Sequence, residues 1–275
     1  FRLALDQARL VHVDASAASL NGHYPARIAA ACDVPALIRA LTAAISPGPT
    51  RQGWAPPELQ AFRRSSLVQA EPVVPAAQPA NAAGFFGALR EALPPDALLV
   101  TDSGLHQMLA RRHFQVLAPR TLIAPTNFQS MGFALPAAIG AKLAHPARQV
   151  VALIGDGGLA MSGMEMLTAV RERVTLTVIG MIDGHYGLIR QQQLGQYGHA
   201  HGTTLLNPDY ARWTASLGAG HILYDGNDSL RSALKAPRPT LLEVPVQDSL
   251  AMRIDTVKAR ARAALKSRRG PEIVA

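Results

Sequence analysis

Two aspartates, Asp156 and Asp183, each follow an apolar run and stand beside glycines, in IGDGGLAMSG (154–163) and MIDGHYG (181–187). Carboxylate oxygens are ligands that Mg²⁺ prefers, and glycines let a backbone come close to a phosphate. Because Asp-Gly is also a common turn pair, either loop taken alone is more simply a tight turn. The spacing of the two aspartates is therefore the evidence that distinguishes a pair of tight turns from a metal site.

One predicted helix and one predicted strand separate Asp156 from Asp183, which is the length of a single βαβ unit. A right-handed crossover of that length brings the two strand ends together at the edge of a parallel sheet where ligands bind. Both carboxylates would then face one Mg²⁺ ion, whose coordination shell a diphosphate would complete.

The glycines of the two loops are predicted to make room for that diphosphate. A helix that we expect to begin near Ser162 would add free N–H groups and the positive end of its dipole. The glycines concerned are Gly155, Gly157 and Gly158 in the first loop and Gly184 and Gly187 in the second.

From residue 81 onward, short apolar runs alternate with helical patterns. Nearly continuous apolar strands are typical of a parallel sheet covered on both faces. We therefore predict an α/β fold with a doubly wound, mostly parallel sheet and helices on both faces. The expected strands are 97–104, 121–125, 149–157, 174–183, 220–225 and 239–246, and the expected helices are 82–93, 105–114, 131–144, 163–173, 186–193, 209–218 and 228–235.

The chain is predicted to have four segments. Residues 1–46 fit the end of an α/β unit, with a strand at 8–15 and a helix that follows the N-cap Asp33. A proline-rich linker with a short helix near 58–66 occupies 47–80, the main domain 81–250, and a basic tail 251–275. Because the sequence begins inside a structural pattern, we expect it to be a fragment of a longer protein.

The composition excludes several classes of protein. The net charge of +8 gathers in RIDTVKARARAALKSRRG (253–270), but aromatic residues are only 5% and do not alternate with basic ones, so we expect no nucleic-acid partner. No apolar run approaches the roughly 20 residues that span a bilayer, and no signal peptide is visible. The single cysteine, Cys32, suits a reducing compartment. We expect a cytoplasmic protein that does not bind membranes.

Several blocks of the sequence resemble one family. VVALIGDGGLAMSGMEMLTAVRERVTLTVIGMIDGHYGLIRQQQ is similar to the diphosphate-binding signature of thiamine-diphosphate enzymes. TDSGLHQM, NFQSMGFALPAAIGAKLAHP and NPDYARWTASLGA resemble blocks of the acetolactate synthase group, catalytic subunit, within that family. VHVDASAASLNGHYP (11–25) resembles the end of that group's central Rossmann-like domain. The resemblance is dense over residues 85–246 and implies the thiamine-diphosphate-binding fold.

The resemblance implies thiamine diphosphate and Mg²⁺ as cofactors and assigns roles to individual positions. Asp156 and Asp183 would be side-chain ligands of the metal, and His185 would contribute its backbone carbonyl. Met131 would lie under the bend between the two cofactor rings, and the backbone near Gln129 would receive the 4′-amino group. The remaining cofactor-binding residues are implied to be Leu105, His106, Gly155, Gly157, Gly158, Tyr186, Gly187, Leu188 and Ile189.

Three positions depart from the family's pattern. The second metal ligand is usually asparagine and is Asp183 here, which adds a negative charge beside the diphosphate. Gln192 stands where some biosynthetic members carry a tryptophan, which puts a preference for larger 2-keto acids in doubt. The glycine-rich turn of the family is replaced by NFQS (127–130).

The catalytic residue stays unassigned. The family's proton-transfer glutamate lies on an N-terminal domain, normally of the partner subunit, and we expect that domain to lie outside this sequence. The glutamates Glu58, Glu71, Glu165 and Glu243 lack the required context.

Two further pairs of residues carry open alternatives. His199 and His201 would either contact substrate or lie in a solvated loop. Thr101 and Asp102 would either orient the loop of His106 or form a plain N-cap.

The resemblance implies decarboxylation of a pyruvate-like 2-keto acid followed by carboligation to a second carbonyl, in a homodimer or higher oligomer with FAD allowed in the central domain. A simple decarboxylase is the alternative within the family. A non-catalytic phosphate- or nucleotide-binding domain is the alternative outside it, although no GxGxxG or GxxxxGK[ST] pattern supports that reading. We expect the fragment alone to be inactive.

Overall fold

The computed structural model describes residues 10–22, 24–45, 57–59 and 82–246 of the chain. The chain divides into two compact units, Phe1–Val73 and Val74–Ala275, which are treated separately here. The basic tail predicted at 251–275 and most of the linker predicted at 47–80 lie outside the described residues. The boundaries of the four predicted segments therefore stay a prediction.

In its described residues the first unit contains a small parallel sheet, a short 3-10 helix, one longer helix and a helical turn at 57–59, within the range where the linker helix was predicted to begin. The N-cap predicted at Asp33 is confirmed, since its Oδ1 accepts a hydrogen bond from the backbone N–H of Ala36 at 2.9 Å. One strand escaped prediction because its sequence, IAAA, is rich in alanine, which is uncommon in strands. The elements are β1 (Val11–Asp14), η2 (Ala17–Ser19), β2 (Ile28–Ala31) and α1 (Val34–Ala44).

The second unit alternates strands and helices along the chain, and every strand and helix predicted in it is present. Its strands are β3 (Leu98–Thr101), β4 (Leu122–Ile123), β5 (Val150–Gly155), β6 (Thr177–Ile182), β7 (Gly220–Leu223) and β8 (Thr240–Pro245). Its helices are α3 (Ala82–Ala92), α4 (Leu105–His113), α5 (Ala134–Ala144), α6 (Asp156–Ser162), η3 (Gly163–Glu165), α7 (Met166–Arg171), α8 (Gly187–Tyr197), α9 (Tyr210–Ser216) and α10 (Asn227–Leu234).

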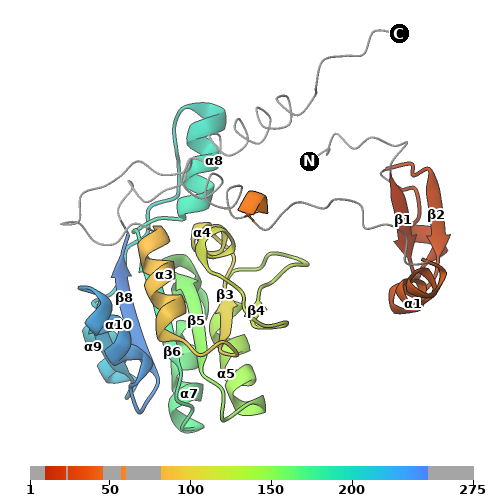
Figure 1. The fold of residues 1–275 in the computed structure, drawn as a ribbon. Coiled ribbons are helices and arrows are strands. Elements are labelled where there is room, and N and C mark those ends of the chain that lie inside the picture. Colours follow the sequence, from red (N-terminus) through yellow and green to blue (C-terminus); the bar gives the residue numbers. More distant parts are fainter. Residues whose placement is uncertain (1–9, 23, 46–56, 60–81, 247–275) are drawn as a thin grey trace. The chain divides into compact units, whose positions relative to one another are not determined.

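The six strands of this unit form one parallel sheet in the order β4-β3-β5-β6-β8-β7. The predicted α/β fold is therefore confirmed. Because all strands run the same way, their carboxyl ends share one edge, and α8 stands above that edge (Figure 1).

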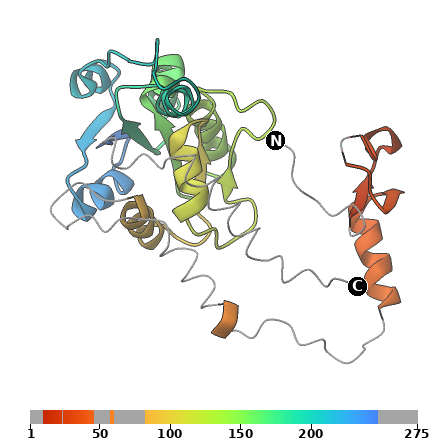
Figure 2. The same ribbon diagram turned by 90° about the horizontal axis from the view of Figure 1, so that it is seen from above.

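Helices cover both faces of the sheet (Figure 2). On one face α3, α4 and α10 pack against alternate strand residues such as Leu99 and Leu153. On the other face α5, α6, α7 and α9 pack against the intervening residues, among them Val100 and Ile154. Strands that bury both faces need apolar residues at every position, which explains the unbroken run VVALI in β5.

Two helices begin elsewhere than predicted. The helix expected near Ser162 is preceded by α6, which begins at Asp156 directly after β5. The helix expected from Met131 begins at Ala134 instead, because Gly132 has a left-handed backbone with φ 79°. The first shift matters for function, because it places the glycines of GDGG in the first turn of a helix.

A search of the described ranges for membrane-spanning segments finds no helix with the length and apolarity that crossing a bilayer requires.

Candidate cofactor site at the carboxyl edge of the sheet

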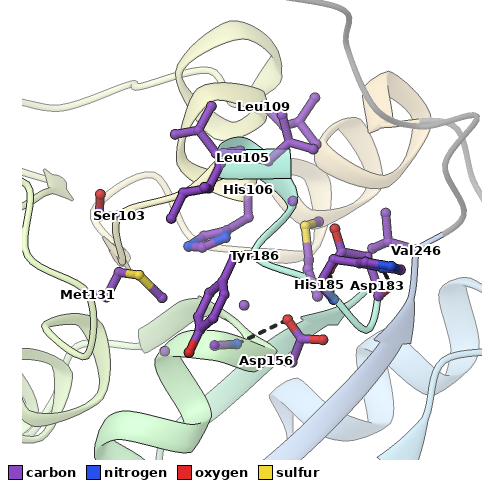
Figure 3. Close-up of a pocket in the computed structure, with 18 of the residues that line it drawn as sticks. Ser103, Leu105, His106, Leu109, Met131, Asp156, Asp183, His185, Tyr186 and Val246 are labelled. Carbon is purple, nitrogen blue, oxygen red and sulfur yellow. Dashed lines mark hydrogen bonds between the residues drawn. The ribbon is translucent and has the colours of Figure 1, made fainter. Parts of the chain in front are cut away.

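A cavity of about 230 Å³ lies where β3, β5 and β6 end. Every residue to which the family resemblance assigns a role lines it, including His106 from α4, Met131 from the loop before α5, and Tyr186 from the loop before α8 (Figure 3), whereas Gly184, which the spacing of the loops suggested, does not. The lining residues that sequence reasoning missed are Ser103, Gly104, Leu109, Met181 and Val246. Of these, Leu109 could have been found, because it follows Leu105 by one helical turn.

The loops of the two aspartates are neighbours. Gly155 at the end of β5 pairs with Met181 of β6, two residues before Asp183. The backbone N–H of Gly184 donates to Asp156 Oδ2 at 2.7 Å, so the second loop is bonded directly to the first carboxylate. The structure therefore brings the two loops together as the βαβ spacing predicts.

The loop of Asp183 is held by its own hydrogen bonds. Asp183 Oδ1 accepts from the backbone N–H of His185 at 2.9 Å, and His185 Nδ1 lies 2.7 Å from the backbone oxygen of Asp183. The imidazole is thus engaged within its loop, in keeping with a role for the backbone of His185 alone. Among the described residues no three His, Cys, Asp or Glu side chains cluster as metal ligands, so a cation here would need oxygens beyond the two carboxylates.

Bare glycine backbone forms the floor of the cavity. A Cβ atom at Gly157 would lie 2.7 Å from Tyr186 Cε1 and 2.8 Å from Met131 Cε. A Cβ atom at Gly155 would lie 3.1 Å from His106 Nδ1. Side chains from three elements therefore pack directly onto this backbone, and the concave surface they leave suits a polar ligand that approaches main-chain groups.

The donors available at this floor differ in part from those predicted. The N–H of Tyr186 already donates to the backbone oxygen of Thr203 at 2.8 Å, so it is engaged in this structure, although Tyr186 itself lines the cavity. Gly187, Leu188 and Ile189 form the first turn of α8, where N–H groups have no intrahelical acceptor. The donors of the second loop therefore start at Gly187.

His106 lines the cavity and has a buried ring nitrogen. Burial lowers the pKa of His106 to about 4, and a hydrogen bond to the backbone carbonyl of Asp102 offsets only part of that effect. The ring is therefore neutral at pH 7. Its Nε2 is buried and has no hydrogen-bond partner among the described residues. An unpaired buried polar atom is costly, so this nitrogen indicates a ligand group that completes its hydrogen bonding.

The depressed pKa of His106 predicts a pH dependence of stability. Between pH 6.5 and about 4 the unfolded chain binds a proton that the folded chain does not, so the free energy of unfolding decreases as the pH falls through this window. The full effect is about 3 kcal/mol. Urea unfolding across this range should show a steeper decrease of stability with falling pH in the wild type than in His106→Gln. Parallel curves would contradict the buried neutral ring.

Gln129 carries backbone strain at the rim of the cavity. Its φ is 52°, in the left-handed region that costs a non-glycine residue on the order of 1 kcal/mol. Its N–H donates to the backbone oxygen of Pro125 at 3.0 Å, which closes the turn of NFQS. The turn that replaces the family's glycine-rich segment therefore still brings Gln129 and Met131 to the cavity.

Asp102 caps a helix that is distant in the sequence. Its Oδ2 and Oδ1 accept from the backbone N–H groups of Gly132 and Phe133, both at 2.9 Å, at the start of α5. Burial raises the pKa of Asp102, and these hydrogen bonds oppose that rise. The side chain of Asp102 thus holds the backbone that leads into α5, and its backbone carbonyl orients His106, whereas α4, the helix that follows Asp102, has Gly104 as its N-cap and no side-chain cap.

Other candidate residues lie away from the cavity. His199 and His201 are exposed after α8, as the solvated-loop alternative predicts, and Gln192 is exposed on α8.

Two glutamates of this unit also lie away from the cavity. Glu165 is exposed and accepts from Thr168 Oγ1 at 2.7 Å. Glu243 pairs with His221, with Oε2 2.7 Å from Nε2. None of these residues lines the cavity.

Comparison with known proteins places this site in a family. Residues 102–244 match the family described as "Thiamine pyrophosphate enzyme, C-terminal TPP binding domain". That range covers over half of the chain and includes the floor of the cavity from Asp102 onward. The chain belongs to the thiamine pyrophosphate enzyme family. Thiamine pyrophosphate is another name for thiamine diphosphate, so the resemblance noted in the sequence is confirmed.

Relatives within the thiamine pyrophosphate enzyme family include acetolactate synthases. The chain is 34% identical to acetolactate synthase of Bacillus subtilis (strain 168) over 58% of this chain and 29% of that protein. It is 32% identical to the acetolactate synthase isozyme 1 large subunit of Escherichia coli (strain K12) over 68% of this chain and 32% of that protein. The chain thus spans about a third of the length of these relatives.

A solved structure has the same fold. The Rhodococcus jostii RHA1 thiamine diphosphate-dependent 4-hydroxybenzoylformate decarboxylase matches 87% of this chain and 44% of its own, with a TM-score of 0.70 and 23% sequence identity. At that identity the match supports the fold of the thiamine pyrophosphate enzymes and nothing finer.

The site fits the cofactor of the thiamine pyrophosphate enzyme family on three observations. Two carboxylates lie in adjoining loops and would suit a divalent cation. Glycines without a Cβ line the cavity at the start of α6, where the N–H groups of a helix N-terminus would suit a diphosphate. His106, whose buried Nε2 has no partner among the described residues, lines the same cavity.

Proposed function

We propose that this chain binds thiamine diphosphate through Mg²⁺ and contributes to the decarboxylation of a pyruvate-like 2-keto acid, followed by ligation to a second carbonyl compound. The observation that carries the proposal is one cavity lined by every residue to which the resemblance assigns a role. The acetolactate synthases among the relatives favour ligation as the second step. When bound, the cofactor supplies the nucleophilic carbon and the electron sink of the reaction.

The two carboxylates have the role of holding the cation. Mg²⁺ prefers oxygen ligands in an octahedron and shares them with phosphates. In this proposal Asp156 and Asp183 each supply a side-chain oxygen and His185 its backbone carbonyl. The negative charge that Asp183 adds strengthens binding of the cation and weakens binding of the diphosphate.

The remaining lining residues position the cofactor. Gly158 and the first turn of α8 offer N–H groups to the diphosphate, whereas the N–H of Gly157 already donates to Asp156 Oδ1 and the unpaired Nε2 of neutral His106 is an acceptor. Met131, with its flexible apolar side chain, lies beside the floor at Gly157 and supports the rings. Apolar residues such as Leu105 and Leu109 exclude water from the reacting end.

The proton chemistry belongs to a group outside this site. Among the described residues, the carboxylates that line the cavity are Asp156 and Asp183, and both are assigned to the cation. We infer that a glutamate from another domain, in a dimer or higher oligomer of the intact protein, activates the cofactor. The chain would then hold the cofactor and remain inactive alone.

Incubation with pyruvate tests this division of labour. Residues 1–275 with Mg²⁺ and thiamine diphosphate are expected to bind the cofactor weakly and to release no carbon dioxide. Turnover is expected only from the polypeptide that also carries the N-terminal domain. Ligation of pyruvate by residues 1–275 alone would contradict the need for a second domain.

Product analysis distinguishes ligation from simple decarboxylation. Acetolactate from pyruvate supports the ligase, and acetaldehyde as the sole product would favour a decarboxylase, such as the enzyme with the similar fold. Absence of both products from the longer polypeptide, with cofactor bound, would favour a non-catalytic binding domain. FAD binding, a cytoplasmic location and the absence of a nucleic-acid partner stay predictions.

A further inference from the structure

Asn207 does not line the cavity, yet its side chain reaches the buried carboxylate of Asp156. Asn207 Nδ2 donates to Asp156 Oδ2 at 2.9 Å, and the N–H of Gly184 donates to the same oxygen at 2.7 Å. Asp156 Oδ1 accepts from the N–H of Gly157 at 3.0 Å, the bond drawn in Figure 3. Because a carboxylate oxygen accepts about two hydrogen bonds, Oδ2 is filled and Oδ1 keeps one acceptor position.

The backbone that carries Asn207 is fixed to the loop of the other aspartate. The N–H of Leu205 donates to the oxygen of Gly184, and the N–H of Tyr186 donates to the oxygen of Thr203, each at 2.8 Å. Between these bonds His185 and Thr204 form an antiparallel bridge. Two residues after Asn207, α9 begins with its own N-cap, Asp209. The amide of Asn207 thus comes to Asp156 from a backbone held on both sides.

We propose that Asn207 is a positioning residue for the metal-binding carboxylate of Asp156. Its amide and the N–H of Gly184 together fix Oδ2 and turn the free acceptor position of Oδ1 toward the cation. The inference rests on the proposed function, because it needs a cation held at Asp156. It adds a third element, the 203–207 segment, to the two loops that the sequence identifies.

The orientation of the Asp156 carboxylate is important because the expected cation is Mg²⁺. It demands near-ideal octahedral geometry, whereas Ca²⁺ accepts flexible coordination and longer bonds. Loss of the amide would leave Oδ2 held by one bond, so the carboxylate could rotate away from the position that Mg²⁺ needs. Loss of a hydrogen-bond donor also leaves more negative charge on the oxygens of Asp156, and this effect alone would strengthen cation binding. We expect orientation to dominate, because partners behind a metal ligand typically change affinity by about 10- to 100-fold.

The test measures cation affinity in the presence of thiamine diphosphate. Isothermal titration of the 275-residue chain gives the dissociation constants of Mg²⁺ and Ca²⁺ for the wild type, Asn207→Ala and Asn207→Gln. We expect Asn207→Ala to weaken Mg²⁺ binding about 10- to 100-fold and Ca²⁺ binding clearly less. Asn207→Gln, which keeps the amide, should restore part of the difference. Asn227→Ala, at an exposed position that opens α10, is the matched control.

The outcomes separate the inference from the proposed function. If the wild type binds no thiamine diphosphate with Mg²⁺, the proposed function fails and the inference fails with it. If the wild type binds and Asn207→Ala binds Mg²⁺ equally or more tightly, or loses both cations equally, the inference alone is overturned. Asn207→Leu keeps the side-chain volume without the amide and replaces Asn207→Ala if that variant does not fold.

Discussion

Asp156→Ala is expected to abolish the binding of thiamine diphosphate with Mg²⁺. The carboxylate is 2% exposed and accepts from Gly157, Gly184 and Asn207, so its removal deletes a buried charge together with the acceptor of three donors. Removing one partner of a buried charge pair costs on the order of 3 kcal/mol or more, which corresponds to a loss of affinity above about 100-fold. Calorimetric titration of the cofactor with Mg²⁺ present measures the loss.

Asp228→Ala is the matched control for that experiment. Asp228 lies on α10 with a fully exposed side chain that pairs only with Arg231 along the same helix. Exposed pairs of this kind contribute little, so this variant should bind the cofactor like the wild type. Circular dichroism of Asp156→Ala verifies that it remains folded. Wild-type affinity in a folded Asp156→Ala protein would refute the assignment of the metal site.

Gly158→Ala is expected to destabilise the fold by about 2 to 4 kcal/mol. A Cβ atom at this position would collide with Asp102 Oδ2 and would lie 2.7 Å from Ile154 Cγ1. Overpacking of a core costs about 1 to 3 kcal/mol, and displacing Asp102 removes a helix cap worth about 1 kcal/mol more. Urea unfolding measures the loss, which should also appear without cofactor.

Gly140→Ala provides the opposite control. Gly140 lies inside α5, and a Cβ atom there would meet nothing within 4 Å. Because alanine favours helices over glycine by about 1 kcal/mol, this variant should be as stable as the wild type or more stable. Equal stability of Gly158→Ala and Gly140→Ala would show that the contact between Gly158 and Asp102 does not constrain the fold.

The local sequence determined the architecture and the location of the site. Strands buried on both faces require apolar residues at every position, so runs such as VVALI and VIGMI were recognisable without a structure. The spacing of Asp156 and Asp183 by one βαβ unit then fixed their loops as neighbours, because the crossover has one hand. Both features follow from patterns within a few tens of residues.

The start of α6 could not be predicted in the same way. GDGGLAMSG holds four glycines in nine residues, and each glycine disfavours a helix by about 1 kcal/mol. The helix nevertheless begins at Asp156, because Gly158 packs on Asp102 and Ile154 where no side chain would fit. Packing with distant residues overrides the local preference here.

The hydrogen bonds that complete the site were also beyond the sequence alone. Asp102 caps α5 from a strand end some 30 residues earlier, and Asn207 holds Asp156 from 51 residues later. The neutral ring of His106 depends on burial, which no spacing of residue types reports. The sequence by itself determined which loops meet and with what chemistry. Only the tertiary structure decided which groups hold the carboxylates in place, because hydrogen bonds and desolvation depend on the distances between elements far apart in the chain.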